Sequence, residues 1–367
     1  MKMLLVITKA DEIGGAQTHV LDVSKQLKEL GHDVIVLVGE EGLFVDLLVK
    51  NNIDVIIENT LVRPIKPITD LKFILKLRRL IKSSKPDIVH LHSSKAGLLG
   101  RFSTFGGGCS CILTAHGWSF AEGIPSKNRF IYSWIERLSS PLLDHIITVS
   151  LHDKNLAIAK KVAPESKLTV IHNGVRYLEK KPIESIKKQK IKLIMVARFS
   201  AQKDHETLFK ALANLTQLNW ELDLVGKGNS LDFYKNYALK LSILDRVNFL
   251  GERDDVNELL SAADIFCLIS NWEGFPISII EAMQIGLPII ASNVGGVSEA
   301  VVHGQNGYLI ERNNAEQLEK YLLELISNTS QRKSFSSQAK MSYYNNFTLD
   351  KMIDKTLIVY DKALNKI

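Results

Sequence analysis

Short apolar runs alternate with longer segments of mixed polarity along most of the chain. The first run, residues 3–7, reads MLLVI, and similar runs occupy 33–38, 53–58, 86–92, 111–116 and 145–150. Strands that are apolar on both faces are typical of a parallel sheet covered by helices on both sides. The intervening segments, such as residues 16–30, are long enough to form those helices. The pattern therefore predicts a doubly wound α/β domain.

The same alternation begins a second time after a break. Residues 176–190 are polar and basic with little periodicity, and the next apolar runs lie at 191–197, 220–226, 247–251, 264–270, 288–292 and 307–310. We expect two Rossmann-like α/β domains, 1–175 and 191–348, joined by a linker at 176–190 and facing each other across a cleft. Ligands of such sheets bind outside the carboxyl ends of the strands.

The composition fits this organisation. The chain has 367 residues, of which 46% are hydrophobic and 23% charged, enough apolar material for two soluble cores. Cys109, Cys111 and Cys267 have no metal-ligand spacing and suit a reducing compartment. The first apolar run has about five residues, too few for a signal peptide, and no segment reaches ~18 uninterrupted apolar residues. We expect a cytoplasmic protein.

Positive charge is concentrated in one segment. Residues 61–101 contain ten Lys or Arg and two acids, an excess of eight, whereas the whole chain has a net charge of +6. Such a patch indicates an anionic partner. The basic residues lack the interleaved aromatics of a single-strand nucleic-acid site, so we expect no nucleic acid.

Two motifs follow strands of the first half. Gly14 and Gly15 precede a helix, where backbone N–H groups can bind a phosphate, although the pair is also compatible with a simple turn. His116 ends a strand, where it is either a cleft residue or a hydrogen-bonded structural histidine. His90 and His92 share one face of a strand, but no third metal ligand is evident from the sequence.

The second half carries matching motifs. Arg198 follows a strand and Lys203 lies near the start of the next helix, where both cations suit phosphate oxygens, unless they are only solvated surface cations. The stretch EGFPISIIEA, 273–282, places Glu273 in a loop and Glu281 inside a short helix that begins near Pro276 and ends at Gly286. Carboxylates accept paired hydrogen bonds from sugar hydroxyls; the alternative is a loop acid and a partner of a buried cation.

Together these motifs resemble the retaining GT-B glycosyltransferases of family 4. The resemblance rests on E-x7-E at 273–281, the pair Arg198 and Lys203, the pair Gly14 and Gly15, and HNGV at 172–175, in the family's order over essentially the whole chain. HSSKAGLLGRF (92–102), TAHGWSF (114–120) and ITVS (147–150) are similar to bacterial members that build O-antigen, capsule or exopolysaccharide on a lipid carrier.

The resemblance implies roles for the motif residues. Gly14 and Gly15 would approach the donor phosphates and the acceptor side, and His116 would lie near the transferred sugar. Arg198 and Lys203 would hold the diphosphate and stabilise the leaving nucleoside diphosphate.

The remaining roles concern the sugar nucleotide itself. Glu273 would face the donor sugar, with the backbone of Gly274, Phe275 and Pro276 binding its hydroxyls, and Glu281 would hold the ribose. The resemblance also implies that the C-terminal helix, about 349–367, crosses back to the first domain. Side-chain cations rather than a metal would stabilise the leaving group, and we find no D-x-D motif, so we expect neither a metal nor a resident cofactor.

The implied reaction is transfer, with retention, of a sugar from a UDP-hexose or UDP-N-acetylhexosamine to a hydroxyl of an undecaprenyl-diphosphate-linked glycan. A GDP-mannose-type donor, a sugar-nucleotide 2-epimerase of the same architecture, and a non-catalytic nucleotide-sugar binder remain alternatives. The basic helix expected at 69–85 would dock the enzyme on the inner face of the cell membrane, or else form an ordinary solvated helix face.

Overall fold

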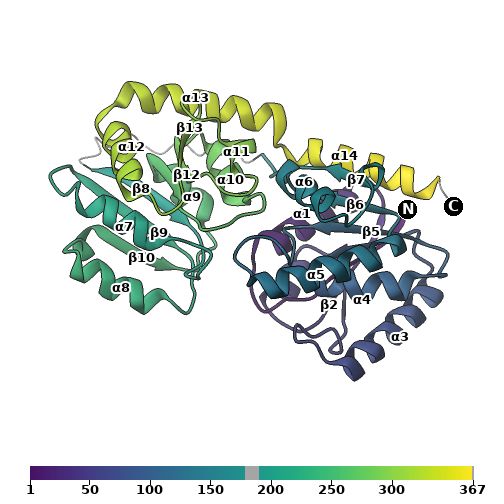
Figure 1. Ribbon diagram of the computed structural model, residues 1–367. Coiled ribbons are helices and arrows are strands. Elements are labelled where there is room, and N and C mark those ends of the chain that lie inside the picture. Colours follow the sequence, from purple (N-terminus) through teal and green to yellow (C-terminus); the bar gives the residue numbers. More distant parts are fainter. Residues whose placement is uncertain (178–189, 366–367) are drawn as a thin grey trace. The chain divides into compact units, whose positions relative to one another are not determined.

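The computed structural model of the chain describes residues 1–177 and 190–365 and divides into two compact units (Figure 1). Unit 1 comprises Met1–Asn173 and Leu349–Ile367, and unit 2 comprises Gly174–Thr348. The boundaries expected from the sequence are 175 for the first domain and 349 for the C-terminal helix. Most of its linker, 176–190, lies outside the described residues.

Unit 1 contains a seven-stranded parallel sheet with the strand order β3-β2-β1-β4-β5-β6-β7. Its strands are β1 (Lys2–Ile7), β2 (Asp33–Val38), β3 (Asp54–Ile57), β4 (Ile88–His92), β5 (Ser110–Ala115), β6 (His145–Thr148) and β7 (Leu168–Val170). Its helices are α1 (Gly15–Glu29), α2 (Leu43–Lys50), α3 (Pro67–Ser84), α4 (Ser94–Thr104), α5 (Ser126–Ser139), α6 (Leu151–Ala159) and α14 (Leu349–Leu364), with 3-10 turns at Ser140–Leu142 and Glu165–Lys167.

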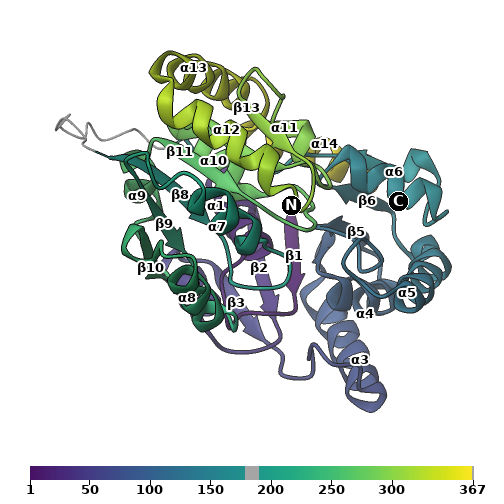
Figure 2. The ribbon, with the colours of Figure 1, turned by 60° about the vertical axis from the view of Figure 1, so that its left-hand side comes forward.

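Alternate residues of β1 build two separate cores, because successive side chains of a strand point to opposite faces. Met3, Leu5 and Ile7 pack on one face with α1, α2 and α14. Leu4 and Val6 pack on the other with α3 and α4. Figures 1 and 2 show α3, α4 and α5 covering this second face. Both faces of the sheet are buried, which explains the nearly continuous apolar strands.

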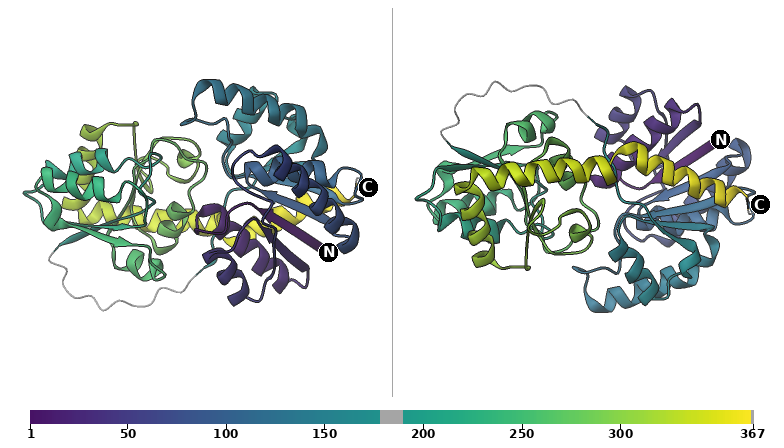
Figure 3. Two further views of the ribbon diagram at one scale, coloured as in Figure 1. Left: turned by 90° about the horizontal axis from the view of Figure 1, so that it is seen from below. Right: turned by 90° about the horizontal axis from the view of Figure 1, so that it is seen from above.

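Helix α14 closes the first core of unit 1 from the far end of the chain. Met352, Ile353 and Tyr360 are buried in that core beside α1. The Tyr360 hydroxyl is 2.7 Å from His90 Nδ1, and the Ser110 hydroxyl donates to the carbonyl of Ala363 at 3.1 Å. Figure 3 shows α14, in yellow, lying along unit 1.

Unit 2 contains a six-stranded parallel sheet with the order β10-β9-β8-β11-β12-β13. Its strands are β8 (Ile191–Val196), β9 (Trp220–Val225), β10 (Val247–Gly251), β11 (Ile265–Leu268), β12 (Ile289–Ser292) and β13 (Gly307–Ile310). Its helices are α7 (His205–Ala213), α8 (Leu231–Lys240), α9 (Val256–Ala262), α10 (Ile277–Ile285), α11 (Val297–Ala300), α12 (Ala315–Ser327) and α13 (Thr329–Asn346), with a 3-10 turn at Leu244–Arg246.

The fold class predicted from the sequence, two doubly wound parallel α/β domains, is confirmed within each unit. In both sheets the strand order reverses once, between β1 and β4 in unit 1 and between β8 and β11 in unit 2. At such a reversal the following connections leave toward opposite faces, which opens a crevice at the carboxyl ends of the two strands. Gly14 and Gly15 follow β1, Arg198 and Lys203 follow β8, and Glu273 follows β11, whereas His116 follows β5, the neighbour of β4 in the sheet.

The basic segment 61–101 does not form one continuous surface patch, which corrects the count made from the sequence. Arg101 is wholly buried and pairs with Glu136 at 2.8 Å, with further bonds to Gly97 and Ser139. Lys95 is partly buried and pairs with Asp70 at 2.5 Å. These two cations therefore serve the packing of α3, α4 and α5. Among the described residues, no helix combines the length and the apolar composition that a bilayer span requires.

We predict that Arg101→Met lowers the free energy of unfolding by about 3–5 kcal/mol, because it leaves the Glu136 carboxylate buried without its cation. Urea denaturation at pH 7 measures this loss. The double variant Arg101→Met with Glu136→Leu should recover much of it, since no buried charge remains. A single variant as stable as the wild type would contradict the structural role of the pair.

His205, at the start of α7, is a second buried polar group. Its ring stacks on Phe199 with centroids 4.4 Å apart and planes inclined by 15°, and the residue is 1% exposed. Burial, reinforced by the charge of Lys203, lowers the pKa of His205 to about 3. The imidazole is therefore neutral in the folded chain at pH 5, whereas the unfolded chain takes up the proton below pH 6.5.

Stability linked to His205 is thus complete above pH 6.5 and is lost as the pH falls from 6.5 toward 3. The free energy of unfolding is therefore about 2 kcal/mol lower at pH 5 than at pH 7 because of this group alone. We predict that His205→Phe reduces the acid sensitivity of unfolding by this amount, measured by urea denaturation at both pH values. Identical losses in the variant and the wild type would contradict the assignment.

Candidate functional site

The segment after β8 is joined to the end of β11 by backbone hydrogen bonds. Asp204 N–H donates to the carbonyl of Ile269 at 2.9 Å, and Asn271 N–H donates to the carbonyl of Gln202 at 2.8 Å. Lys203 lies between these bonds and forms an isolated antiparallel bridge with Ser270. The loop carrying Lys203 is thereby fixed against the loop carrying Glu273, at the strand-order reversal of unit 2.

Lys203 and Glu273 form an ion pair at this position. Their side chains are only 11% and 6% exposed. Buried charges are stable when they are paired and hydrogen-bonded. The structure therefore brings together two of the predicted catalytic residues, which are 70 positions apart in the sequence.

Gln202 is a site residue that sequence reasoning missed. Its amide Nε2 donates to Glu273 Oε2 at 3.1 Å and to the carbonyl of Trp272 at 3.0 Å. Each carboxylate oxygen of Glu273 thus has its own donor, Lys203 on Oε1 and Gln202 on Oε2. Residue type gave no signal for this role, because the partner of Gln202 is set by the pairing of the two loops.

The loops at this edge are in close backbone contact. Gly295 has φ +56, and a Cβ at this position would lie 1.9 Å from the carbonyl oxygen of Glu273. Gly296 N–H also donates to the carbonyl of Gly274 at 2.9 Å. Only glycine permits both the conformation and the approach at position 295, so the sequence NVGG fixes the backbone that carries Glu273.

Helix α10 follows the Glu273 loop. Pro276 caps it and Gly286, with φ +84, ends it; the expected start at Pro276 is shifted by one residue, to Ile277. The helix is buried apart from two partly exposed residues, Ser278 and Glu281. Phe275 is buried and its ring lies 5.5 Å from that of Phe347, which holds the start of the helix.

Arg198 is exposed in the loop directly after β8, at the same edge. This edge of unit 2 therefore offers an exposed guanidinium and a fixed ammonium for anionic oxygens. It also offers the Glu273 carboxylate for hydroxyl groups, and the partly exposed Glu281 lies in α10, the helix that follows the Glu273 loop. A diphosphate joined to a sugar and a ribose presents the complementary groups, anionic oxygens and hydroxyls.

In unit 1, Gly14 and Gly15 mark the start of α1. Gly14 is the N-cap, and its N–H donates to Gln17 Oε1 at 3.2 Å. Gly15 is the first helical residue and is exposed. The turn expected from the glycine pair is present, and the positive end of the helix macrodipole lies at this point.

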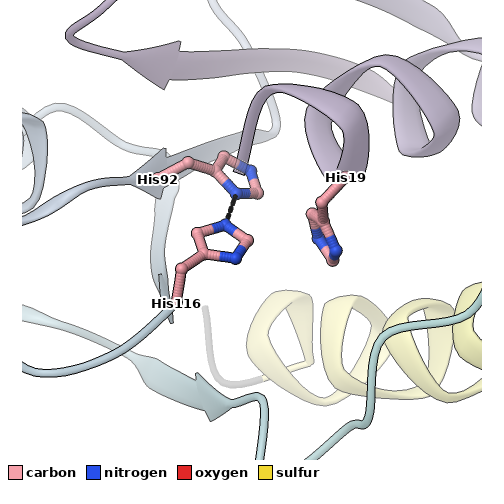
Figure 4. Close-up of side chains that lie close together, drawn as sticks. All are labelled: His19, His92 and His116. Atoms are coloured by element: carbon pink, nitrogen blue, oxygen red, sulfur yellow. Dashed lines mark hydrogen bonds between the residues drawn. The ribbon is translucent and has the colours of Figure 1, made fainter. Parts of the chain in front are cut away.

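His116 follows β5 and belongs to a cluster of imidazoles (Figure 4). Its Nε2 lies 3.2 Å from His92 Nδ1, and its ring centroid is 4.7 Å from that of His19. Burial lowers the pKa of His92 and His116 well below the ordinary histidine value and lowers that of His19 to about 4. All three rings are therefore neutral at pH 7.

The pair His90 and His92 divides between two environments. Both ring nitrogens of His90 are hydrogen-bonded, at 2.7 Å to the Tyr360 hydroxyl and at 2.7 Å to Thr114 Oγ1. His90 is thus a structural residue, whereas His92 joins His116 and His19. A third ligand beside this pair is not evident from the sequence, because His19 and His116 come from other elements of the fold.

A cavity of about 380 Å³ lies at the carboxyl ends of β1, β2 and β3. Its polar lining includes Thr8 and Asn59 together with charges of both signs: Lys9, Asp11, Glu40, Arg63 and Lys66. Such a lining suits a ligand that carries hydroxyl groups and negative charge. All residues that line this cavity belong to unit 1.

Two family models match the chain. The model described as Glycosyltransferase Family 4 matches residues 13–177, and the model described as Glycosyl transferases group 1 matches residues 177–342. An Escherichia coli protein, UDP-Gal:alpha-D-GlcNAc-diphosphoundecaprenol alpha-1,3-galactosyltransferase, is 30% identical over 96% of this chain and 95% of its own length. The O-antigen biosynthesis glycosyltransferase WbnH of Escherichia coli is 30% identical over 89% of this chain and 90% of its own.

Among solved structures, Anabaena HepE in complex with UDP and glucose has the same fold, with a TM-score of 0.85 at 23% identity over 98% of this chain and 99% of that one. Because the two models together match residues 13–342 and a relative is 30% identical over 96% of the chain, the chain belongs to the GT-B glycosyltransferases of family 4.

Proposed function

We propose that this glycosyltransferase moves a hexosyl or N-acetylhexosaminyl group from a UDP-sugar to a hydroxyl of an undecaprenyl-diphosphate-linked glycan, with retention of configuration. The observation that carries the proposal is the Lys203–Glu273 pair, fixed by Gln202 at the strand-order reversal of unit 2. The name of the first relative, which specifies a UDP-galactose donor and a diphosphoundecaprenol acceptor, supports the choice of substrates.

The charges of unit 2 suit the bond that must break. Cleavage between the anomeric carbon and the diphosphate oxygen leaves negative charge on the departing UDP. The Lys203 ammonium and the Arg198 guanidinium stabilise this negative charge, and these two cations take the place of a metal ion. Because Glu273 already fixes Lys203, little reorganisation accompanies the reaction.

Retention follows from attack on the face that the diphosphate leaves. The acceptor hydroxyl oxygen forms the new bond to the anomeric carbon, and its proton passes to an oxygen of the departing diphosphate. Glu273 and the backbone of residues 274–276 bind the hydroxyls of the sugar, Glu281 binds the ribose, and His116 contacts the transferred sugar. The backbone of Gly14 and Gly15 approaches the phosphates of the donor.

Transfer of labelled sugar from UDP-galactose, UDP-glucose and the two UDP-N-acetylhexosamines to a synthetic lipid-diphosphate-linked N-acetylglucosamine tests the assignment. With the donor that is accepted, we predict that Lys203→Met and Glu273→Gln lower kcat about 10²-fold, because fixed charge is lost at the leaving group. Glu281→Gln should instead raise the KM for the donor about tenfold, since it removes a charged hydrogen-bond acceptor.

Lys210→Met is the matched control. Lys210 forms an ion pair with Glu206 at 2.7 Å on the exposed face of α7, and its side chain is 51% exposed. This variant should retain wild-type kinetics. Equal kinetics for Lys203→Met and Lys210→Met would contradict the role given to the Lys203–Glu273 pair.

We also propose that unit 1 docks on the inner face of the cell membrane. Ile68, Leu71 and Leu75 of α3 are 75%, 57% and 48% exposed. Their spacing of three and four residues places them on one face of the helix. An exposed apolar stripe on a helix otherwise rich in cations is typical of an interfacial helix.

Basic residues border this stripe. Three of them are exposed: Lys72 directly follows Leu71, Lys76 directly follows Leu75, and Arg79 lies one helical turn after Leu75. Phe130 and Trp134 of α5, another helix of unit 1, are also exposed. Anionic lipids attract such cations by about 1 kcal/mol for each residue near the surface. Apolar insertion and charge attraction together would bring the enzyme to its lipid-linked acceptor.

We predict that the protein sediments with vesicles containing phosphatidylglycerol, binds weakly to pure phosphatidylcholine, and is released by salt. Leu71→Ser combined with Leu75→Ser should reduce the bound fraction severalfold. Leu239→Ser, at a residue of α8 that is 61% exposed, serves as the control. Equal binding of the wild type, the Leu71→Ser/Leu75→Ser variant and the Leu239→Ser control to the anionic vesicles would refute docking through α3.

A further inference from the structure

Three histidines from separate elements of unit 1 converge on one point. His19 comes from the second turn of α1, His92 ends β4, and His116 follows β5 (Figure 4). One nitrogen from each ring lies within 4.8 Å of the other two. Within residues 1–177 and 190–365, this is the one cluster of three or more potential ligand side chains with such spacing.

The spacing is close to that of a metal centre. His92 Nδ1 and His116 Nε2 are 3.2 Å apart. Two nitrogens bound at ~2.0–2.1 Å to a tetrahedral zinc are separated by roughly 3.3 Å. The His92–His116 pair therefore already has the separation of two zinc ligands, and a nitrogen of His19 lies within 4.8 Å of both.

The surroundings of the rings favour coordination. His19 Nδ1 lies 3.1 Å from Asn173 Oδ1, so a proton on Nδ1 leaves the lone pair on Nε2. Metal-binding histidines commonly donate their second nitrogen to such an oxygen. His92 directs Nδ1 toward His116 Nε2, so when Nδ1 binds a metal the neutral His92 ring carries its proton on Nε2.

The donor set also selects the class of metal. All three donors are imidazole nitrogens. Imidazole nitrogen suits Zn²⁺, Co²⁺, Ni²⁺ and Cu²⁺, whereas Mg²⁺ and Ca²⁺ prefer oxygen ligands. His19 and His92 are buried and His116 is partly exposed. The fourth coordination position would therefore open on the side of His116.

We propose that His19, His92 and His116 bind one divalent d-block cation such as Zn²⁺, and that its binding inhibits sugar transfer. The inhibitory part rests on the proposed function, in which His116 contacts the transferred sugar. A cation bound to the His116 ring withdraws its nitrogen from that contact. The centre is thus a site of reversible inhibition.

Cobalt provides a direct test, because four-coordinate Co²⁺ absorbs visible light far more strongly than the six-coordinate aqueous ion. The full-length protein, without an affinity tag and freed of metal by a chelator, is titrated with Co²⁺. The proposal expects strong visible bands that saturate at one equivalent, disappear on addition of Zn²⁺, and persist with a large excess of Mg²⁺. The weak spectrum of aqueous Co²⁺ at every ratio would overturn it.

Variants then assign the ligands. His19→Gln and His116→Gln should each lower the affinity for Co²⁺ at least tenfold, whereas His303→Gln, at an exposed histidine of unit 2, should leave it unchanged. Since His116 is partly exposed, its variant is expected to fold, and thermal unfolding verifies this. Equal affinity in His116→Gln and the wild type would overturn the assignment of the three ligands.

The inhibitory part has its own readout. One equivalent of Zn²⁺ should lower the transfer rate at least tenfold, and EDTA should restore it. Tetrahedral cobalt bands with an unchanged rate in Zn²⁺ would retain the metal site and overturn inhibition. Absence of transfer in the metal-free protein with every donor would instead count against the proposed function, and the cobalt spectrum would still decide the metal site.

Discussion

Each sheet of this glycosyltransferase reverses its strand order once, and this topological constraint determines where polar chemistry can occur. The strands are mostly apolar, because helices cover both faces of each sheet, and buried polar side chains within them, such as His90 and Asp223, are hydrogen-bonded. Polar side chains are therefore displaced to the carboxyl ends, where the connections diverge. In unit 2, Lys203 follows β8 and Glu273 follows β11. In unit 1, His19 lies in the helix after β1 and His92 ends β4. These four strands are the ones at which the strand order reverses.

The two edges solve the problem of burying polar groups differently. In unit 2 a carboxylate and an ammonium are buried together, and Gln202 occupies the remaining carboxylate oxygen. The charges are thus retained and fixed. In unit 1 neutral imidazoles are packed against one another, and burial suppresses their protonation. The first arrangement suits the stabilisation of developing charge, whereas the second leaves nitrogen lone pairs available to a cation.

Much of the fold could be predicted from the sequence, because strands buried on both faces and glycine-terminated helices leave local signals. Gly286, for example, ends α10 where the sequence indicated. Partners distant in the sequence could not be predicted. Arg101 was counted with the surface cations, yet packing of α4 against α5 buries it beside Glu136. Likewise, the roles of Gln202 and His19 depend on which loops the fold brings together.

The central claim is that the edge of unit 2 binds a uridine diphosphate sugar, and thermal unfolding with a panel of nucleotides tests it most directly. A ligand that binds only the folded chain raises its unfolding temperature. UDP and at least one UDP-hexose or UDP-N-acetylhexosamine should raise the Tm in the wild type, with a smaller rise in Glu281→Gln. GDP and GDP-mannose should have no effect. A rise with the guanine nucleotides alone, or with none of the panel, would contradict the account.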